Sequence, residues 1–317
     1  MNGLNIVFFG APEFAAASLA ALIKSKHKIT AVVSQPDRPK GRSGKPVPTP
    51  VSVLAENAGI PILRPEKVRD NDFIAELSQI PADIFIVAAY GQFLNRKLLE
   101  MARFGAVNVH ASLLPKYRGA SPVASAIING EIKTGVSIMQ MERGMDTGPV
   151  LHSLEIEIDR GDTCGSLTEK LAVLGGTALL DALDLIAAGC AVPVAQNNSE
   201  VTYAPLLTKE MGLLDFNKPA LAIYNQVRGL DPWPGSHIEL DGRMLKVWRA
   251  DIGSERHTLP PGTVISAASG MISIACGNCE TIDLKEVQTP GGKRLTVSEY
   301  IKGNPIIAGG TPALPEL

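Results

Sequence analysis

Short apolar runs alternate with segments of helically spaced apolar residues through the first half of the chain. The runs predict strands at residues 4–9, 29–33, 83–89 and 107–110. The segments between them predict helices at residues 14–23, 51–57 and 73–77. Strands that alternate with helices are typical of a parallel sheet covered by helices. The pattern therefore predicts an α/β fold with a Rossmann-like, mostly parallel sheet.

Two β-like runs and a long amphipathic helix complete the first predicted domain. The runs lie at residues 134–141 and 150–158, and the helix covers residues 167–188 before Gly189. Clear periodicity is then lost up to about residue 206. We therefore expect a first domain at residues 1–189, a linker at 190–206 and a second domain at 207–317.

The second domain has the pattern of a small barrel. After a predicted helix at residues 220–227, short alternating runs follow at residues 237–240, 245–249, 263–266, 271–275 and 282–287. Short strands separated by turn residues are typical of a small OB-like β-barrel. Barrels of this kind often bind nucleic acid, although a fold alone does not establish a function.

The strongest candidate chemistry lies in residues 105–119, which read GAVNVHASLLPKYRG. In a strand, Val107 and Val109 point to one side of the sheet. Asn108 and His110 then point to the other side, near a carboxyl end of the kind where open α/β sheets bind ligands. The alternative is a buried strand whose amide and imidazole are only hydrogen-bonded.

A second candidate is the segment 35–50, in which Pro and Gly recur every few residues and predict an absence of regular structure. Its charged residues are Asp37, Arg38, Lys40, Arg42 and Lys45. A mobile basic loop near the carboxyl ends of the first strands is suited to binding phosphates. A solvated surface loop is the alternative.

Composition narrows the classes of function. The chain has 317 residues, is 45% hydrophobic and 20% charged, and carries a formal net charge of −2, which is ordinary for a two-domain globular protein. An RNA partner would therefore need a local basic patch. No apolar run approaches membrane-spanning length and residues 1–9 lack a signal-peptide pattern. We expect a cytoplasmic monomer with no membrane partner.

Two motifs that suggest other chemistry are weak. The turn after the first strand has one glycine followed by Ala11-Pro12-Glu13, whereas a dinucleotide-binding loop reads GxGxxG. Glu13 would also repel a pyrophosphate, which argues against a nicotinamide-dependent dehydrogenase. Residues 276–279 read CGNC, but they lie between two β-like runs without a second ligand pair. They predict a hairpin turn and no metal site.

Three polar residues and an apolar loop stand in a fixed order: Asn108-Val-His110, then Ser112-Leu113-Leu114-Pro115 with Gly119, then Asp146-Thr-Gly-Pro. In this order and spacing they resemble the formyltetrahydrofolate-dependent formyltransferase family. Residues 35–39, 209–210 and 232–235 are similar to the members of that family that act on methionyl-tRNA. One departure is Phe216, where those members usually have Trp, and it affects packing and not the chemistry.

The resemblance implies roles for these residues. The catalytic residues are expected to be Asn108, His110 and Asp146. The folate-binding loop is expected to be Ser112, Leu113, Leu114 and Pro115. Arg42 matches an arginine that contacts the end of the tRNA. The implied partners are initiator methionyl-tRNA and 10-formyltetrahydrofolate as formyl donor, with no metal and no nucleotide cofactor.

Formyl transfer to an amine creates an oxyanion and releases a proton, but it requires no side-chain nucleophile. The Asn108 amide and a His110 N–H are suited to donate to the oxyanion. Asp146 is suited to hold the imidazole tautomer and to help accept the proton. A sugar-nucleotide formyltransferase that acts on a UDP-amino sugar would use the same residues and is the main alternative. A non-catalytic RNA-binding module on the same fold is the alternative from another class.

Replacing Arg42 by Ala is expected to weaken the use of charged tRNA while hydrolysis of the formyl donor continues, because only a phosphate contact is lost. Both rates can be measured on one preparation. Equal loss of the two rates would show that the loop shapes the folate pocket and does not bind RNA.

Overall fold

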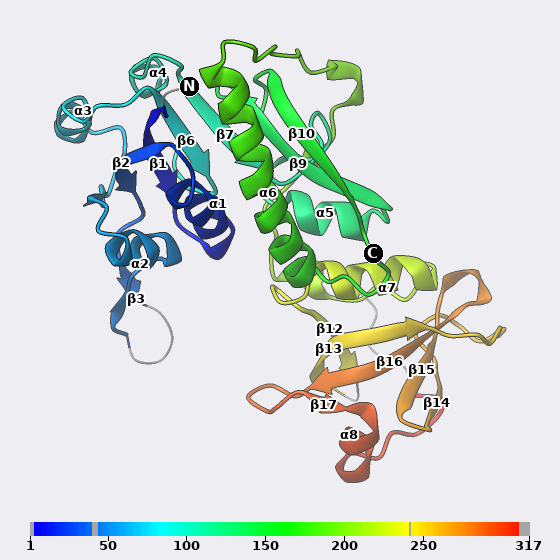
Figure 1. Cartoon of the computed structure of the whole chain (residues 1–317). Helices are drawn as coiled ribbons and strands as arrows, with labels where there is room; N and C mark the ends of the chain where they lie inside the picture. The colour runs from blue at the N-terminus through cyan, green and yellow to red at the C-terminus, as the bar shows by residue number, and fades with distance from the viewer. Residues whose placement is uncertain (1–2, 40–43, 241, 311–317) are drawn as a thin grey trace. The chain divides into compact units, whose positions relative to one another are not determined.

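The computed structural model describes residues 3–39, 44–240 and 242–310, which form two compact units (Figure 1). The described part of the first unit falls within residues 1–122, 133–157 and 168–204. The described part of the second falls within residues 123–132, 158–167 and 205–317. Two short segments from the middle of the sequence, residues 123–132 and 158–167, thus belong to the second unit. Each unit is therefore made of three segments that are not continuous in the sequence.

A seven-stranded sheet forms the centre of the first unit, in the order β10-β9-β7-β6-β1-β2-β5. Its strands are β1 (Asn5–Gly10), β2 (Lys28–Val33), β5 (Ile62–Leu63), β6 (Ile84–Ala88), β7 (Ala106–His110), β9 (Lys133–Gln140) and β10 (Val150–Glu157). Neighbouring strands from β5 to β7 run parallel, whereas β9 is antiparallel to both β7 and β10. The predicted α/β fold with a mostly parallel sheet is confirmed.

Helices cover both faces of this sheet. They are α1 (Glu13–Ile23), α2 (Pro50–Asn57), α3 (Asn71–Leu77), α4 (Arg96–Leu99) and α6 (Cys164–Ala187). On one face, α3 and α4 contribute to a core that includes Phe9 and Phe85 of the sheet. On the other face, Gly175 of α6 packs so closely on β7 that an added Cβ would lie 3.1 Å from Val109. Figure 1 shows α1 and α6 on this same side of the sheet.

The segment 35–50 is more regular than its composition predicts. β3 (Arg38–Pro39) pairs antiparallel with β4 (Pro46–Val47), so the prediction of no regular structure there is wrong. A ladder this short remains possible because Arg38 and Val47, which face each other, each keep the backbone N–H that proline lacks. Lys40 and Arg42, the centre of the predicted basic loop, lie outside the described residues.

The second unit is built on an antiparallel sheet in the order β12-β13-β16-β15-β14, with β17 also paired to β16. Its strands are β12 (Ser236–Leu240), β13 (Arg243–Ile252), β14 (Val264–Ala268), β15 (Met271–Ala275), β16 (Thr281–Gln288) and β17 (Leu295–Thr296). The helices α7 (Ala220–Gly229) and α8 (Val297–Gly303) accompany it. Within the described ranges no ladder joins β14 to β12. The OB-like barrel therefore stays a prediction, while the predicted strands are confirmed.

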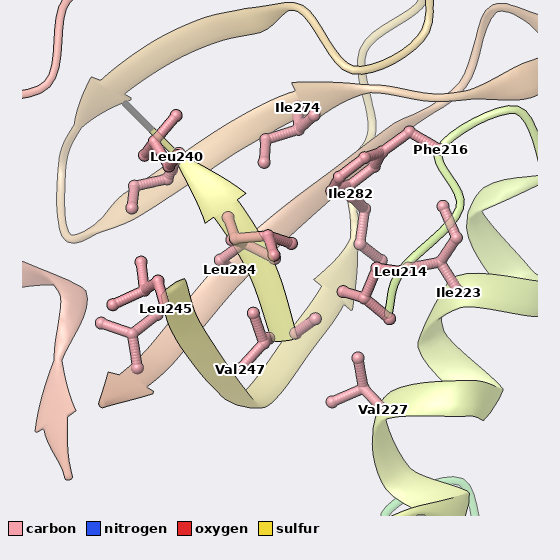
Figure 2. Close-up of a cluster of buried hydrophobic side chains, with 14 of the residues drawn as sticks. Leu214, Phe216, Ile223, Val227, Leu240, Leu245, Val247, Ile274, Ile282 and Leu284 are labelled. Atoms are coloured by element: carbon pink, nitrogen blue, oxygen red, sulfur yellow. The ribbon is translucent and has the colours of Figure 1, made fainter. Parts of the chain in front are cut away.

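Alternating strand residues and one face of α7 form the core of the second unit (Figure 2). Ile282 and Leu284 are two apart on β16, so they point to the same side of the sheet. Ile223 and Val227 are four apart on α7, so they lie on one helix face. Phe216 is fully buried within this cluster. Phe216, which stands where the resembled family usually has Trp, is thus a packing residue, as expected.

The CGNC motif forms a turn between two paired strands. β15 and β16 are antiparallel neighbours, and Asn278 adopts the left-handed conformation with φ 59° between them. Burial raises the pKa of the Cys276 thiol to about 12, so this thiol stays protonated near neutral pH. No group of three or more His, Cys, Asp or Glu that could hold a metal ion occurs in the part of the chain that the structure describes. None of the described helices is both long and apolar enough to span a bilayer.

Truncating Phe216 to Ala should lower the free energy of unfolding of the second unit by about 3–5 kcal/mol, because a cavity replaces a fully buried ring. Both tryptophans, Trp233 and Trp248, lie in this unit, so tryptophan fluorescence in denaturant reports its unfolding. Leu221→Ala is the matched control, because Leu221 lies on α7 and is 54% exposed. Similar small shifts for both variants would contradict the packing role of Phe216.

Candidate active site

Asn108 and His110 lie on β7 and project from the face opposite Val109, as the strand period predicts. Asn108 is paired with Val87 of β6 and Met139 of β9, so the strand that carries it is fixed on both sides. Its side chain is half-buried, and no hydrogen-bond partner for its carboxamide is found among the described residues. The Asn108 amide is therefore free to donate to a ligand.

The His110 ring is held between a carbonyl and a carboxylate. Its Nε2 lies 2.9 Å from the carbonyl oxygen of Tyr117, and its Nδ1 lies 3.7 Å from Oδ2 of Asp146. A carbonyl oxygen only accepts, so Nε2 carries the proton in this contact. In neutral His110, Nδ1 is then the unprotonated nitrogen, and it faces Asp146. The side chain of His110 is 6% exposed, which keeps this arrangement largely dry.

Asp146 comes from the turn between β9 and β10 and is brought close to His110 by tertiary structure. Its backbone is left-handed, with φ 52°, a conformation that Asp tolerates better than most residues. Oδ2 accepts a hydrogen bond of 2.8 Å from the backbone N–H of Gly119. The Asp146 carboxylate thus contacts both a distant loop and His110. An Asp that only caps its own turn would make neither contact.

The predicted folate loop, residues 112–115, is clamped by one buried hydroxyl. Ser137 Oγ on β9 donates to the carbonyl of Ser112 at 2.8 Å and accepts from the N–H of Leu114 at 3.0 Å. Ser153 Oγ on β10 donates in turn to Ser137 Oγ at 3.1 Å. Ser137 carries no distinctive signal in the sequence, because it is one serine in an apolar strand.

A cavity of about 430 Å³ borders this loop. Its lining includes Leu114 and Pro115, residues 150–153 of β10 and part of the segment 194–200. Asn108, His110 and Asp146 are not part of that lining. The structure therefore brings two of the four predicted folate-loop residues to a space large enough to hold part of a small molecule.

Polar residues also meet where β1 and β6 are neighbours, the point at which the strand order reverses and open α/β sheets commonly bind ligands. Gln35 Nε2 donates to the carbonyl of Tyr90 at 2.8 Å, just beyond β6. The Tyr90 hydroxyl is buried without a hydrogen-bond partner among the described residues, and burial raises its pKa. No feature of the sequence singled out residues 90–92 as part of a site.

Residues 190–206, predicted as a linker, contact the site directly. Gln196 donates to the carbonyls of Asp146 and Gly148, and Thr202 accepts from the N–H of Tyr117. The loss of periodicity in this segment gave no indication of these contacts. Of the predicted site residues, Asn108, His110, Asp146 and the 112–115 loop lie in one region, and Arg42 lies outside the described residues.

Comparison with known proteins adds two family matches and several full-length relatives. Residues 4–183 match the formyl transferase model, and residues 206–305 match the model of the formyl transferase C-terminal domain. Methionyl-tRNA formyltransferase from Lachnospira eligens is 42% identical over 311 residues, covering 96% of this chain and 98% of the relative. The protein of the same name from Citrifermentans bemidjiense is 43% identical over 310 residues, covering 98% and 96%.

Solved structures share the fold at lower identity. An N-formyltransferase from Helicobacter canadensis, in complex with folinic acid and dTDP-3-aminofucose, is 20% identical with a TM-score of 0.66, covering 90% of this chain and 99% of that one. HypX from Aquifex aeolicus, in complex with tetrahydrofolic acid, is 15% identical with a TM-score of 0.64, covering 95% of this chain and 47% of that one. At these identities the likeness shows the fold.

Replacing Ser137 by Ala should speed hydrogen exchange at the Leu114 amide about tenfold or more, because an unpartnered buried group costs about 1–3 kcal/mol. NMR-detected exchange measures this at single residues. Ser153→Ala is the matched control, since it removes the donor to Ser137 but leaves the Leu114 N–H with its acceptor. Equal exchange at Leu114 in both variants would show that Ser137 does not hold the loop.

Proposed function

The chain belongs to the formyl transferase family, among the methionyl-tRNA formyltransferases, and on that basis we propose that it formylates the free amino group of methionine on initiator methionyl-tRNA. The observation that carries this proposal is identity of 42–43% to relatives of that name over at least 96% of the chain. Residues 4–183 match the formyl transferase model and residues 206–305 match its C-terminal domain model, so the similarity extends over both halves of the chain. The product serves translation initiation, which places the proposed activity in the cytoplasm.

The proposed donor is 10-formyltetrahydrofolate. Two proteins that share the fold carry folates, folinic acid in one and tetrahydrofolic acid in the other. Here the loop 112–115 would hold the folate, and its clamped backbone and the adjoining cavity support that role. Arg42 is proposed to contact the tRNA.

The proposed chemistry starts with attack of the neutral methionyl amine on the formyl carbon. The carbonyl oxygen then becomes an oxyanion on a tetrahedral carbon. The unpartnered Asn108 amide is suited to donate to that oxygen, because the donor is already fixed on a buried strand and needs no rearrangement. Collapse of the intermediate breaks the bond between the formyl carbon and the folate nitrogen, which takes up a proton as it leaves.

The geometry changes the role expected for His110. Its Nε2–H is engaged by the Tyr117 carbonyl and is not available to an oxyanion. Its Nδ1 is the free nitrogen, so we assign it the proton that the attacking amine loses. The Asp146 carboxylate, 3.7 Å away, would stabilise the imidazolium that forms. His110 would then return the proton to the departing folate nitrogen.

Asn108→Ala is expected to lower kcat by about 100-fold, since removing one oxyanion donor costs about 3 kcal/mol of barrier, while folate affinity changes little. Formylation of methionyl-tRNA and equilibrium binding of the folate measure the two effects. Asn108→Asp keeps the shape of the side chain but loses the donor, so it should lose activity to a similar extent. An active Asn108→Asp enzyme would remove the donor role.

The acceptor is tested on the wild-type protein by offering methionyl-tRNA and a UDP-amino sugar in parallel. Transfer to the tRNA alone is the expected result. Transfer to the sugar alone would replace the proposed function by the sugar-nucleotide alternative, and transfer to neither would favour a non-catalytic role.

A further inference from the structure

Gln196 uses the full hydrogen-bonding capacity of its side chain to join two parts of the site. Its Oε1 accepts from Nε and Nη2 of Arg118 at 2.9 and 2.8 Å. Its Nε2 donates to the carbonyls of Asp146 and Gly148 at 2.8 and 2.7 Å. A carboxamide offers two donor hydrogens and two acceptor lone pairs, and all four are used here. The side chain therefore has one orientation and bridges segments that are far apart in sequence.

Arg118 provides a rigid anchor for this bridge. Its residue exposure is 4%, and its other side-chain partner is Oδ1 of Asn198 at 3.3 Å. No carboxylate lies within ion-pair distance of Arg118 among the described residues. A guanidinium only donates, so the amide oxygen of Gln196 must face it and the amide nitrogen must face the turn that carries Asp146.

The turn held by Gln196 carries the carboxylate of the site. Asp146 has a left-handed backbone, which persists in a non-glycine residue where surrounding contacts fix it. Gln196 binds the carbonyls of residues 146 and 148, and the Gly119 N–H binds the Asp146 carboxylate. These contacts set the position of Oδ2 relative to His110.

The other end of the same segment holds the opposite side of the imidazole. The carbonyl of Thr202 accepts from the Arg118 N–H at 2.9 Å, and its hydroxyl accepts from the Tyr117 N–H at 2.9 Å. Tyr117 supplies the carbonyl that binds Nε2 of His110. Gly119 fits beneath the segment only because it has no side chain, as an added Cβ would lie 2.5 Å from the Ala204 carbonyl oxygen.

We propose that Gln196 is a positioning residue that fixes Asp146 for proton transfer at His110, with Arg118 as its anchor. The inference rests on the proposed function for its chemical consequence, but its structural part does not. Two residues of the segment 194–204, Gln196 and Thr202, then hold the partners of the two imidazole nitrogens, so this segment is not a passive connection.

The substitution Gln196→Glu keeps the contacts with Arg118 and removes the contacts with the turn that carries Asp146. The carboxylate still accepts from Arg118, but an oxygen replaces the nitrogen that donates to the two carbonyls, and that oxygen repels them. We expect kcat to fall by about 10- to 100-fold, because small misplacement of a catalytic group is costly, with KM for methionyl-tRNA within about twofold of wild type. Gln196 also lines the cavity beside the loop 112–115, so KM for methionyl-tRNA and not for the folate is the readout. Gln196→Leu, which adds no charge, should change kcat in the same direction.

Asn198→Ala is the matched control, since Asn198 contacts the same guanidinium but is not bonded to the turn. Its kcat should stay within about twofold of wild type. A similar loss in Asn198→Ala would show that the effect belongs to the segment as a whole and not to the bonds between Gln196 and the turn, and would overturn the proposal. A raised KM for the folate with unchanged kcat in Gln196→Glu would also overturn it, because that result indicates binding.

Amide hydrogen exchange tests the positioning without any assay of activity. The Gly119 N–H is bonded to Asp146, whereas the Arg118 N–H is bonded to Thr202. In Gln196→Glu, exchange at Gly119 should accelerate several-fold while exchange at Arg118 stays unchanged. Unchanged exchange at Gly119 would overturn the proposal. Absence of formyl transfer by the wild-type protein would instead refute the proposed function, and the exchange result would still decide whether Gln196 fixes Asp146.

Discussion

The contact between the Asp146 carboxylate and the Gly119 N–H is the constraint on which the site depends. It joins residues 27 apart in sequence at 2.8 Å, and it brings a charged group from a turn to a ring on a central strand. A hydrogen bond to a carboxylate in a largely dry place is stronger than one between neutral groups. Strand β7 by itself fixes Asn108 and His110. Asp146 is the third of these residues, and only tertiary contacts bring it to the other two.

Two kinds of polar group can be distinguished around this contact. Ser137 and Gln196 have several partners each, and they hold loops in place. Asn108 and the Tyr90 hydroxyl have no hydrogen-bond partner among the described residues, although both lie at or near the carboxyl ends of neighbouring strands. A buried polar group without a partner is costly, so the Tyr90 hydroxyl has a physical reason to be kept only if a ligand can complete its hydrogen bond.

The sheet explains why these groups gather. Parallel neighbours β1, β6 and β7 end at the same edge, and the strand order reverses between β1 and β6. Beyond β7, the antiparallel strand β9 pairs Ser137 with His110 at the end of β7, so Ser137 lies beneath the loop 112–115. The turn that follows β9 then brings the Asp146 carboxylate to His110. The parallel strands thus supply the rigid residues, and the antiparallel addition to the sheet supplies the carboxylate.

The sequence by itself determined the alternation of strands and helices, the face on which Asn108 and His110 lie, and the hairpin at residues 276–279. Each of these follows from a local period or a turn residue, which acts within one element. Tertiary structure decided which nitrogen of His110 is free, that Asp146 reaches it, and that residues 194–204 hold both sides of the ring. It also gave residues 38–39 and 46–47 a ladder that their prolines argued against. These outcomes depend on which donors and acceptors meet across long sequence distances, and a local pattern carries no information about such partners.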